Sequence, residues 1–153
     1  MVTPREHPQW AMVVAGLLLA TGIACDEPTP PEDPLYLTVR AEPTEVVAGD
    51  SVFIEITLVN RSTSTVTVTS PESCLIDFHV MDPDGEIVAQ SGQGCFPKVW
   101  DHDILPGSST TTYVWAVKKT QPAGDYSVRA VMYLYERASK FSEPVQVRVL
   151  ENS

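Results

Sequence analysis

A two-residue alternation of apolar and polar side chains recurs along the chain after residue 34, and it constrains the fold more than any other sequence feature. The alternation is clearest in residues 51–60, where every second side chain is a large aliphatic one. β-Branched and aromatic residues follow the same habit in further segments: residues 35–41, 65–69, 76–80, 110–117, 126–135 and 145–149. Half-buried strands have this period, and no segment longer than a turn has the helical one. The sequence therefore predicts an all-β domain.

Turn-forming residues separate these segments at intervals typical of a β-sandwich. Proline presets one turn dihedral and glycine supplies a positive φ, and the two occur together in residues 82–85, 106–108 and 122–125. We expect a hairpin turn at residues 82–85. The 13 prolines also argue against a helical bundle. The prediction is an immunoglobulin-like β-sandwich of about seven or eight short antiparallel strands over residues 35–153.

Two aromatic residues are assigned structural roles in this sandwich. Trp115 alternates with Val114 and Ala116, and we expect its indole in the core. Tyr126 follows a turn and enters a late strand, which resembles the tyrosine corner of Greek-key sandwiches. In that corner the hydroxyl group bonds the backbone a few residues upstream.

The first 24 residues are predicted to be a lipoprotein signal peptide. Residues 10–24 form an uncharged stretch of 15 residues. This stretch is short for a membrane span, but its length suits the apolar part of a signal peptide. Residues 22–25, Gly-Ile-Ala-Cys, resemble the bacterial lipobox, in which the cysteine thiol is lipidated. Gly22 departs from the usual branched residue at its position. An ordinary cleaved signal peptide and an uncleaved anchor are the alternatives to lipidation of Cys25.

Residues 25–34 are predicted to be a disordered linker between Cys25 and the domain. Residues 26–34 hold four acids, four prolines and almost no apolar surface. Such a segment cannot form a core and stays extended and solvated. This segment also holds much of the net charge of −10. An excess of acidic over basic residues argues against a nucleic-acid binder, because such a protein needs clustered cations.

The cysteine count supports export and a disulfide. Of three cysteines, Cys25 is assigned to lipid, which leaves Cys74 and Cys95 as an even pair in an oxidising compartment. We expect these two to form a disulfide, with two free thiols as the alternative.

Several short motifs, in order, resemble the intracellular proteinase inhibitor (BsuPI) domain. They are Asn60-Arg61-Ser62, Asp77-Phe78, the Asp82–Glu86 turn, Phe96, Leu105–Ser108, Trp115 and Ala123–Val128. The resemblance covers about residues 52–131. It implies an all-β, immunoglobulin-like fold and inhibition of a bacterial serine protease. The chain departs from the family in lacking a tryptophan-rich stretch at residues 87–90, in carrying two cysteines, and in being predicted as exported, so an intracellular protease could not be its target.

The segment of residues 91–103 is the candidate partner-binding loop. It lacks strand signals, and Cys95 would fix its middle to Cys74. Phe96 and Trp100 are aromatic anchors of the kind that dominate interfaces, and Lys98 could enter a trypsin-like primary pocket. In the alternative, Phe96 and Trp100 fold back over the open end of the sandwich and complete its core.

No catalytic, metal-binding or cofactor-binding residues are predicted. Cys74, His79, Cys95 and His102 lack the spacing of a structural zinc site. Asp101-His102-Asp103 resembles a base with acidic neighbours but has no glycine-flanked serine, and we expect a solvated turn there.

The sequence thus predicts a non-enzymatic lipoprotein of the bacterial cell envelope, on the periplasmic or cell-surface side. Its expected partners are the membrane, through the N-terminal lipid, and a protein such as a protease. No small-molecule substrate is indicated. The alternative is a structural or accessory envelope lipoprotein without inhibitory activity.

Overall fold

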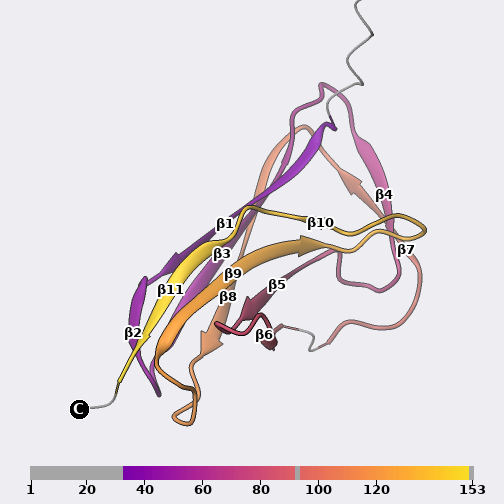
Figure 1. Ribbon diagram of the computed structural model, residues 1–153. Helices are drawn as coiled ribbons and strands as arrows, with labels where there is room; N and C mark the ends of the chain where they lie inside the picture. The colour runs from indigo at the N-terminus through magenta and orange to yellow at the C-terminus, as the bar shows by residue number, and fades with distance from the viewer. Residues whose placement is uncertain (1–32, 92–93, 152–153) are drawn as a thin grey trace, which may run out of the picture. The chain divides into compact units, whose positions relative to one another are not determined.

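The described part of the chain is entirely β-structure. The computed structural model describes residues 33–91 and 94–151, and these contain eleven strands and no helix (Figure 1). One compact unit begins at Asp33. The predicted signal peptide, Cys25 and most of the predicted linker lie outside the described residues. The all-β prediction is confirmed.

The first sheet has three antiparallel strands with β3 at its centre. Its members, in spatial order, are β1 (Leu35–Glu42), β3 (Ser51–Asn60) and β8 (Gly107–Ala116). The pairing of β3 with β8 runs unbroken from Ser51–Ala116 to Asn60–Gly107. One face of β3 is buried through Val52, Ile54, Ile56 and Leu58, as the alternation predicts.

The second sheet has six strands. Five of them follow the spatial order β2 (Glu45–Val47), β11 (Val145–Leu150), β9 (Gly124–Met132), β5 (Ile76–Met81) and β6 (Ile87–Gln90), and β10 (Lys140–Phe141) also pairs with β9. All pairs are antiparallel except that of β2 with β11. β5 and β6 form the hairpin predicted at residues 82–85, where Gly85 has a φ of 87° and its N–H donates to the Asp82 carbonyl at 3.0 Å.

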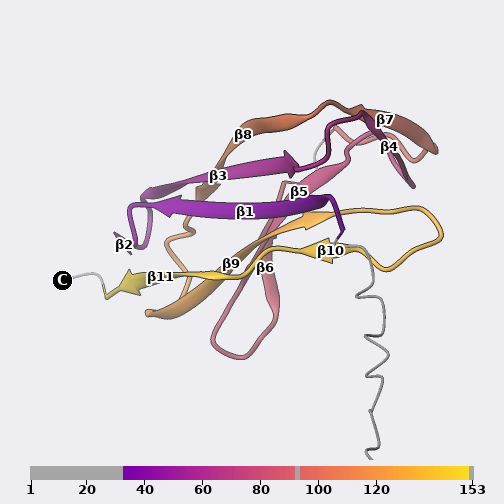
Figure 2. The ribbon, with the colours of Figure 1, turned by 90° about the horizontal axis from the view of Figure 1, so that it is seen from above.

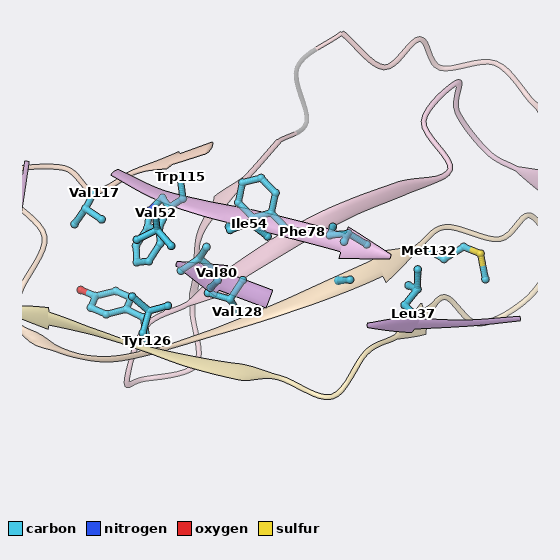
Figure 3. Close-up of a cluster of buried hydrophobic side chains, with 14 of the residues drawn as sticks. Leu37, Val52, Ile54, Phe78, Val80, Trp115, Val117, Tyr126, Val128 and Met132 are labelled. Atoms are coloured by element: carbon cyan, nitrogen blue, oxygen red, sulfur yellow. The ribbon is translucent and has the colours of Figure 1, made fainter. Parts of the chain in front are cut away.

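The two sheets pack face to face around one apolar core (Figure 2). Trp115 from the first sheet meets Tyr126 from the second with ring centroids 5.6 Å apart, and Figure 3 shows both residues within the cluster. The predicted core position of Trp115 is confirmed, since its exposed fraction is 3%. The Tyr126 hydroxyl donates to the Pro122 carbonyl oxygen at 2.8 Å, which is the bond expected of a tyrosine corner. The two-layer packing is that of a β-sandwich.

The number of strands differs from the prediction of about seven or eight. β2 and β10 have three and two residues, too few for an alternation to be visible in the sequence. β7 (Trp100–Ile104) overlaps the end of residues 91–103, where a loop was expected, and extends one residue beyond them. It pairs with β4 (Val66–Ser70) in a separate two-stranded ribbon. The pairing of β2 with β11 also makes the strand set mixed rather than wholly antiparallel.

Candidate partner-binding loop

The β4–β7 ribbon carries a polar ladder on its outer face. The Thr67 hydroxyl donates to the Asp103 carboxylate and the Thr69 hydroxyl donates to the Asp101 carboxylate, each at 2.7 Å. Each of these bonds joins residues that are directly opposite in the strand register. Cross-strand side-chain pairs of this kind stabilise a two-stranded ribbon, which is marginal alone. The expected solvated turn at residues 101–103 is therefore wrong, because the two aspartates pair with threonines across a strand ladder.

His102 lies on the other face of the same strand. Its Nε2 shares a hydrogen bond of 2.8 Å with the hydroxyl oxygen of Ser70, and that hydroxyl group also donates to the Glu72 carbonyl. Ser70 is completely buried. Because Asp101 and Asp103 are held on the opposite face, the structure does not bring them together with His102. The Ser70–His102 pair thus has a structural role in closing the ribbon.

Asn60 fastens the ribbon to the end of β3. Its side-chain amide donates to the carbonyl oxygens of Ser64 and Ile104 at 2.9 and 2.8 Å, and its Oδ1 accepts from the Ser62 N–H and hydroxyl. The side chain is buried, so these bonds satisfy the polar atoms that burial takes from water. The Asn60-Arg61-Ser62 motif therefore sets the position from which the ribbon leaves the sandwich.

A disulfide and two backbone contacts fix the segment before β7. Cys74 and Cys95 are bonded, with their Cα atoms 5.3 Å apart. The Ser73 N–H donates to the Phe96 carbonyl at 3.0 Å, and the Phe96 N–H donates to the Ser73 hydroxyl at 2.8 Å. Because Cys74 and Cys95 are bonded to each other, neither is a free thiol that could bind zinc together with His79 and His102. We call residues 94–100, which end at the first residue of β7, the braced loop, since all three contacts hold this segment.

The braced loop presents apolar side chains to solvent. The exposed fractions are 68% for Phe96, 47% for Val99 and 44% for Trp100. The alternative in which Phe96 and Trp100 complete the core is wrong. Val66, Val68 and Ile104 of the ribbon pack against the core at this end instead.

Lys98 and Trp100 lie together where the braced loop enters β7. The Lys98 ammonium is 5.4 Å from the centroid of the Trp100 ring, within the range of a cation–π contact. The Lys98 N–H donates to the Phe96 carbonyl at 2.8 Å, so the backbone turns at the intervening proline. The loop therefore combines an aromatic surface, one cation and a backbone shape that is already set.

A buried polar cluster lies on the outer face of β5. The Asp77 carboxylate accepts the Ser91 N–H at 2.9 Å, where the chain leaves β6. His79 is buried and its Nε2 shares a hydrogen bond of 3.1 Å with the Tyr133 hydroxyl. Burial and the charge of Arg129 lower the pKa of His79, while Asp77 opposes them. Burial and the charges of Asp77 and Glu72 raise the pKa of Tyr133 to about 12.

Sequence reasoning missed the burial of His79. Its alternation with Phe78 and Val80 correctly places it on the outer face of the sheet. That face is covered here by Tyr133 and Phe141, whose rings each have centroids 6.3 Å from the imidazole. The sequence around His79 does not predict its burial, because the residues that cover it lie more than fifty positions further along the chain.

A groove of about 630 Å³ lies where the two sheets come to an edge. β6 forms one side and β8 the other, with Phe78 and Trp115 between them and Lys118 at the rim. No sequence pattern indicated this groove, because its two sides come from strands of different sheets. Among residues 33–91 and 94–151, no group of three or more His, Cys, Asp or Glu side chains is arranged to hold a metal ion. The same residues contain no helix of the length and apolarity needed to cross a membrane.

The solved structures that match this chain are distant from it. The sporulation control protein of Bacillus subtilis has a TM-score of 0.49 and 11% identity, over 79% of this chain and 50% of that one. An alkylpurine DNA glycosylase of Pseudomonas fluorescens has a TM-score of 0.48 and 10% identity, over 76% of this chain and 30% of that one. A CARDB domain from Pyrococcus furiosus has a TM-score of 0.44 and 14% identity, over 77% of this chain and 94% of that one. These likenesses carry no function to this chain.

The family comparison is more informative. A search of the curated proteins finds no match. The family model described as "Intracellular proteinase inhibitor" matches residues 39–136, a wider span than the motifs alone indicated. Since this match covers well over half of the 153 residues, the chain belongs to the intracellular proteinase inhibitor (BsuPI) family.

Proposed function

We propose that this protein is an exported, lipid-anchored proteinase inhibitor that binds its target through the braced loop and performs no chemistry of its own. The observation that carries the proposal is the exposure of Phe96, Val99 and Trp100 on a segment fixed by a disulfide. Membership of a proteinase-inhibitor family supplies the class of partner.

The energetic argument rests on the state of the loop before binding. A loop that must become ordered on binding loses about 0.5–1.5 kcal/mol for each immobilised side chain. Here the disulfide, the two Ser73–Phe96 bonds and the Lys98–Phe96 turn already hold the backbone. Aromatic side chains on such a surface are the usual hot spots of protein interfaces. The contact area is therefore available without a large entropic cost.

Lys98 gives the surface a chemical preference. Its ammonium lies over the Trp100 ring rather than in an ion pair with a described residue, so it is available to an acidic pocket. Trypsin-like proteinases have an aspartate at the base of their primary pocket, which binds lysine and arginine side chains. We expect Lys98 to favour such targets, with Phe96 and Trp100 contacting the rim of the active-site cleft.

The cysteines support a location outside the cytoplasm. Disulfides persist in oxidising compartments, so the Cys74–Cys95 bond is typical of an exported protein, despite the family's description as intracellular. We propose that Cys25 carries the lipid and that residues 26–32 separate the domain from the membrane. Mass spectrometry of the protein extracted from membranes should find a lipid-modified Cys25. A Cys25→Ser chain that remained membrane-bound would contradict the anchor.

The activity is tested with the purified full chain against a panel of secreted serine proteinases, both trypsin-like and subtilisin-like. We expect inhibition at micromolar concentration, strongest for trypsin-like enzymes. The double variant Phe96→Ala/Trp100→Ala should lose it, and Lys98→Ala should lose it for trypsin-like enzymes only. Phe53→Ala is the matched control, because it removes an aromatic ring that is 58% exposed but lies on β3, away from the loop.

Two outcomes would contradict the proposal. If the wild-type chain inhibits no member of the panel at micromolar concentration, the inhibitory function fails and a structural envelope protein becomes the better reading. If inhibition occurs but the Phe96→Ala/Trp100→Ala variant inhibits as well as Phe53→Ala, the braced loop is not the contact surface.

A further inference from the structure

We propose that the free edge of β8 pairs antiparallel with β8 of a second copy of this chain, which joins two three-stranded sheets in a symmetric dimer. β8 lies at the end of its sheet and, among the described strands, pairs with β3 alone (Figure 2). Its register with β3 is unbroken over Gly107–Ala116. An edge of this kind presents a regular row of unpaired N–H and C=O groups, which is a template for a further strand.

The strands at the other ends of the two larger sheets carry features that prevent such pairing, and β8 does not. β2 has three residues, and β6 has four and a register break against β5. β1 carries Arg40 and Glu42 and is followed by Pro43. Short length, irregular register, charge and proline are the usual means by which sheet edges avoid other chains. β8 has ten residues with no charged side chain, no proline and no bulge.

The side chains of β8 favour a second copy over a different protein. Residues 108–112 read Ser-Ser-Thr-Thr-Thr, and all five are exposed. A hydroxyl group both donates and accepts, so a run of hydroxyls is complementary to itself when a two-fold axis brings it against its own copy. A charged edge would instead meet its own charge. Within the molecule, the hydroxyl oxygens of Thr57 and Thr110 already form such a pair across two strands, 3.1 Å apart.

Antiparallel self-pairing also covers an exposed apolar residue. Val114 is 56% exposed and shares the outer face of the sheet with Thr110 and Thr112. Pairing about the middle of the strand places Val114 of one copy beside the Ser-Thr run of the other. The dimer would thus remove apolar surface from water on both sides of the axis.

The test is sedimentation velocity of the purified full chain in mild detergent, from nanomolar to high micromolar concentration. We expect a concentration-dependent monomer–dimer equilibrium. Thr112→Lys should weaken it by about tenfold or more, because like charges then meet near the two-fold axis. The single chain tolerates this change, since Thr112 is exposed and lies opposite Glu55 on β3. Thr38→Lys is the matched control, an exposed threonine on the outer face of β1 in the same sheet.

Hydrogen exchange of the β8 amides gives a second readout. The amides of residues 108–112 that point away from β3 should be protected at high concentration in the wild type and in Thr38→Lys, and unprotected in Thr112→Lys. If Thr112→Lys has no melting transition, Ser108→Lys replaces it. A wild-type chain that stays monomeric throughout the range overturns the proposal and leaves the edge open to a strand of another protein. Equal dimerisation of wild type and a folded Thr112→Lys or Ser108→Lys variant would also overturn it.

Discussion

The two tryptophans of the domain show how differently the sandwich and the braced loop are held together. Trp115 is 3% exposed, packed on Tyr126 between the two sheets. Trp100 is 44% exposed, and the Lys98 ammonium lies 5.4 Å from its ring centroid. Burial of apolar area stabilises the sandwich, whereas the disulfide and hydrogen bonds set the shape of the loop. A segment whose shape does not depend on burying its own aromatic rings can offer them to a partner.

The largest expected effect separates the two tryptophans. Trp115→Ala should lower the free energy of unfolding by about 3–5 kcal/mol, through lost transfer energy and the cavity left between the sheets. Trp100→Ala should lower it by less than about 1 kcal/mol, since the ring is already in contact with water. Urea titration followed by circular dichroism measures both. Equal losses would mean that Trp100 supports the fold as Trp115 does.

Removing the disulfide should act on the loop more than on the sandwich. Cys74→Ser/Cys95→Ser is expected to lower the free energy of unfolding by about 3 kcal/mol, because the bond closes a loop with a separation of 21 residues in the unfolded chain. Limited proteolysis should then cut within residues 94–100 before any sandwich strand. First cleavage in β3 or β9 would show that the two regions are not independent.

A smaller effect is expected at the tyrosine corner. Tyr126→Phe removes the hydroxyl that donates to the Pro122 carbonyl at 2.8 Å, and should lower the free energy of unfolding by about 1 kcal/mol. Tyr135→Phe is the control, because Tyr135 is exposed. Inhibition of a target proteinase should be the same for both variants, since neither residue lies in the braced loop.

The smallest effect concerns pH and the buried cluster around His79. Burial and Arg129 hold the pKa of His79 below its ordinary value of 6.5, so the unfolded chain takes up the proton first as the pH falls. The free energy of unfolding should therefore be constant well above pH 6.5 and decline as the pH drops through that value toward the lowered pKa. His79→Gln should flatten this decline, as measured by urea midpoints across the range. An unchanged slope would place the acid sensitivity in other groups.

The body of the fold could be predicted from local pattern, because its strands follow the rule that alternates buried and exposed side chains. Residues 51–60 became β3 with the expected buried face, and Trp115 and Tyr126 took the expected positions. β7 escaped prediction because Asp101 and Asp103 resemble turn residues until Thr69 and Thr67 are placed opposite them. Strand identity there depends on a partner about thirty residues away.

The site could be predicted only in part. The pairing of Cys74 with Cys95 and the choice of loop came from cysteine count and apolar content. Whether Phe96 and Trp100 face solvent was left open by the sequence, since that depends on which side chains fill the end of the sandwich. Val66, Val68 and Ile104 of the ribbon are partly buried against the core, whereas Phe96 and Trp100 are exposed.

In the braced loop, the residues that fix the backbone differ from those that form the exposed surface, and this separation affects how the protein can change over evolution. Cys74, Cys95 and Ser73 set the loop's path, while Phe96, Lys98 and Trp100 provide its surface with side chains that the fold does not need. Under the proposed function, substitutions at these surface positions would alter target preference at little cost in stability, because exposed positions tolerate change. The loop is therefore a natural place to graft or randomise sequence when a new specificity is sought.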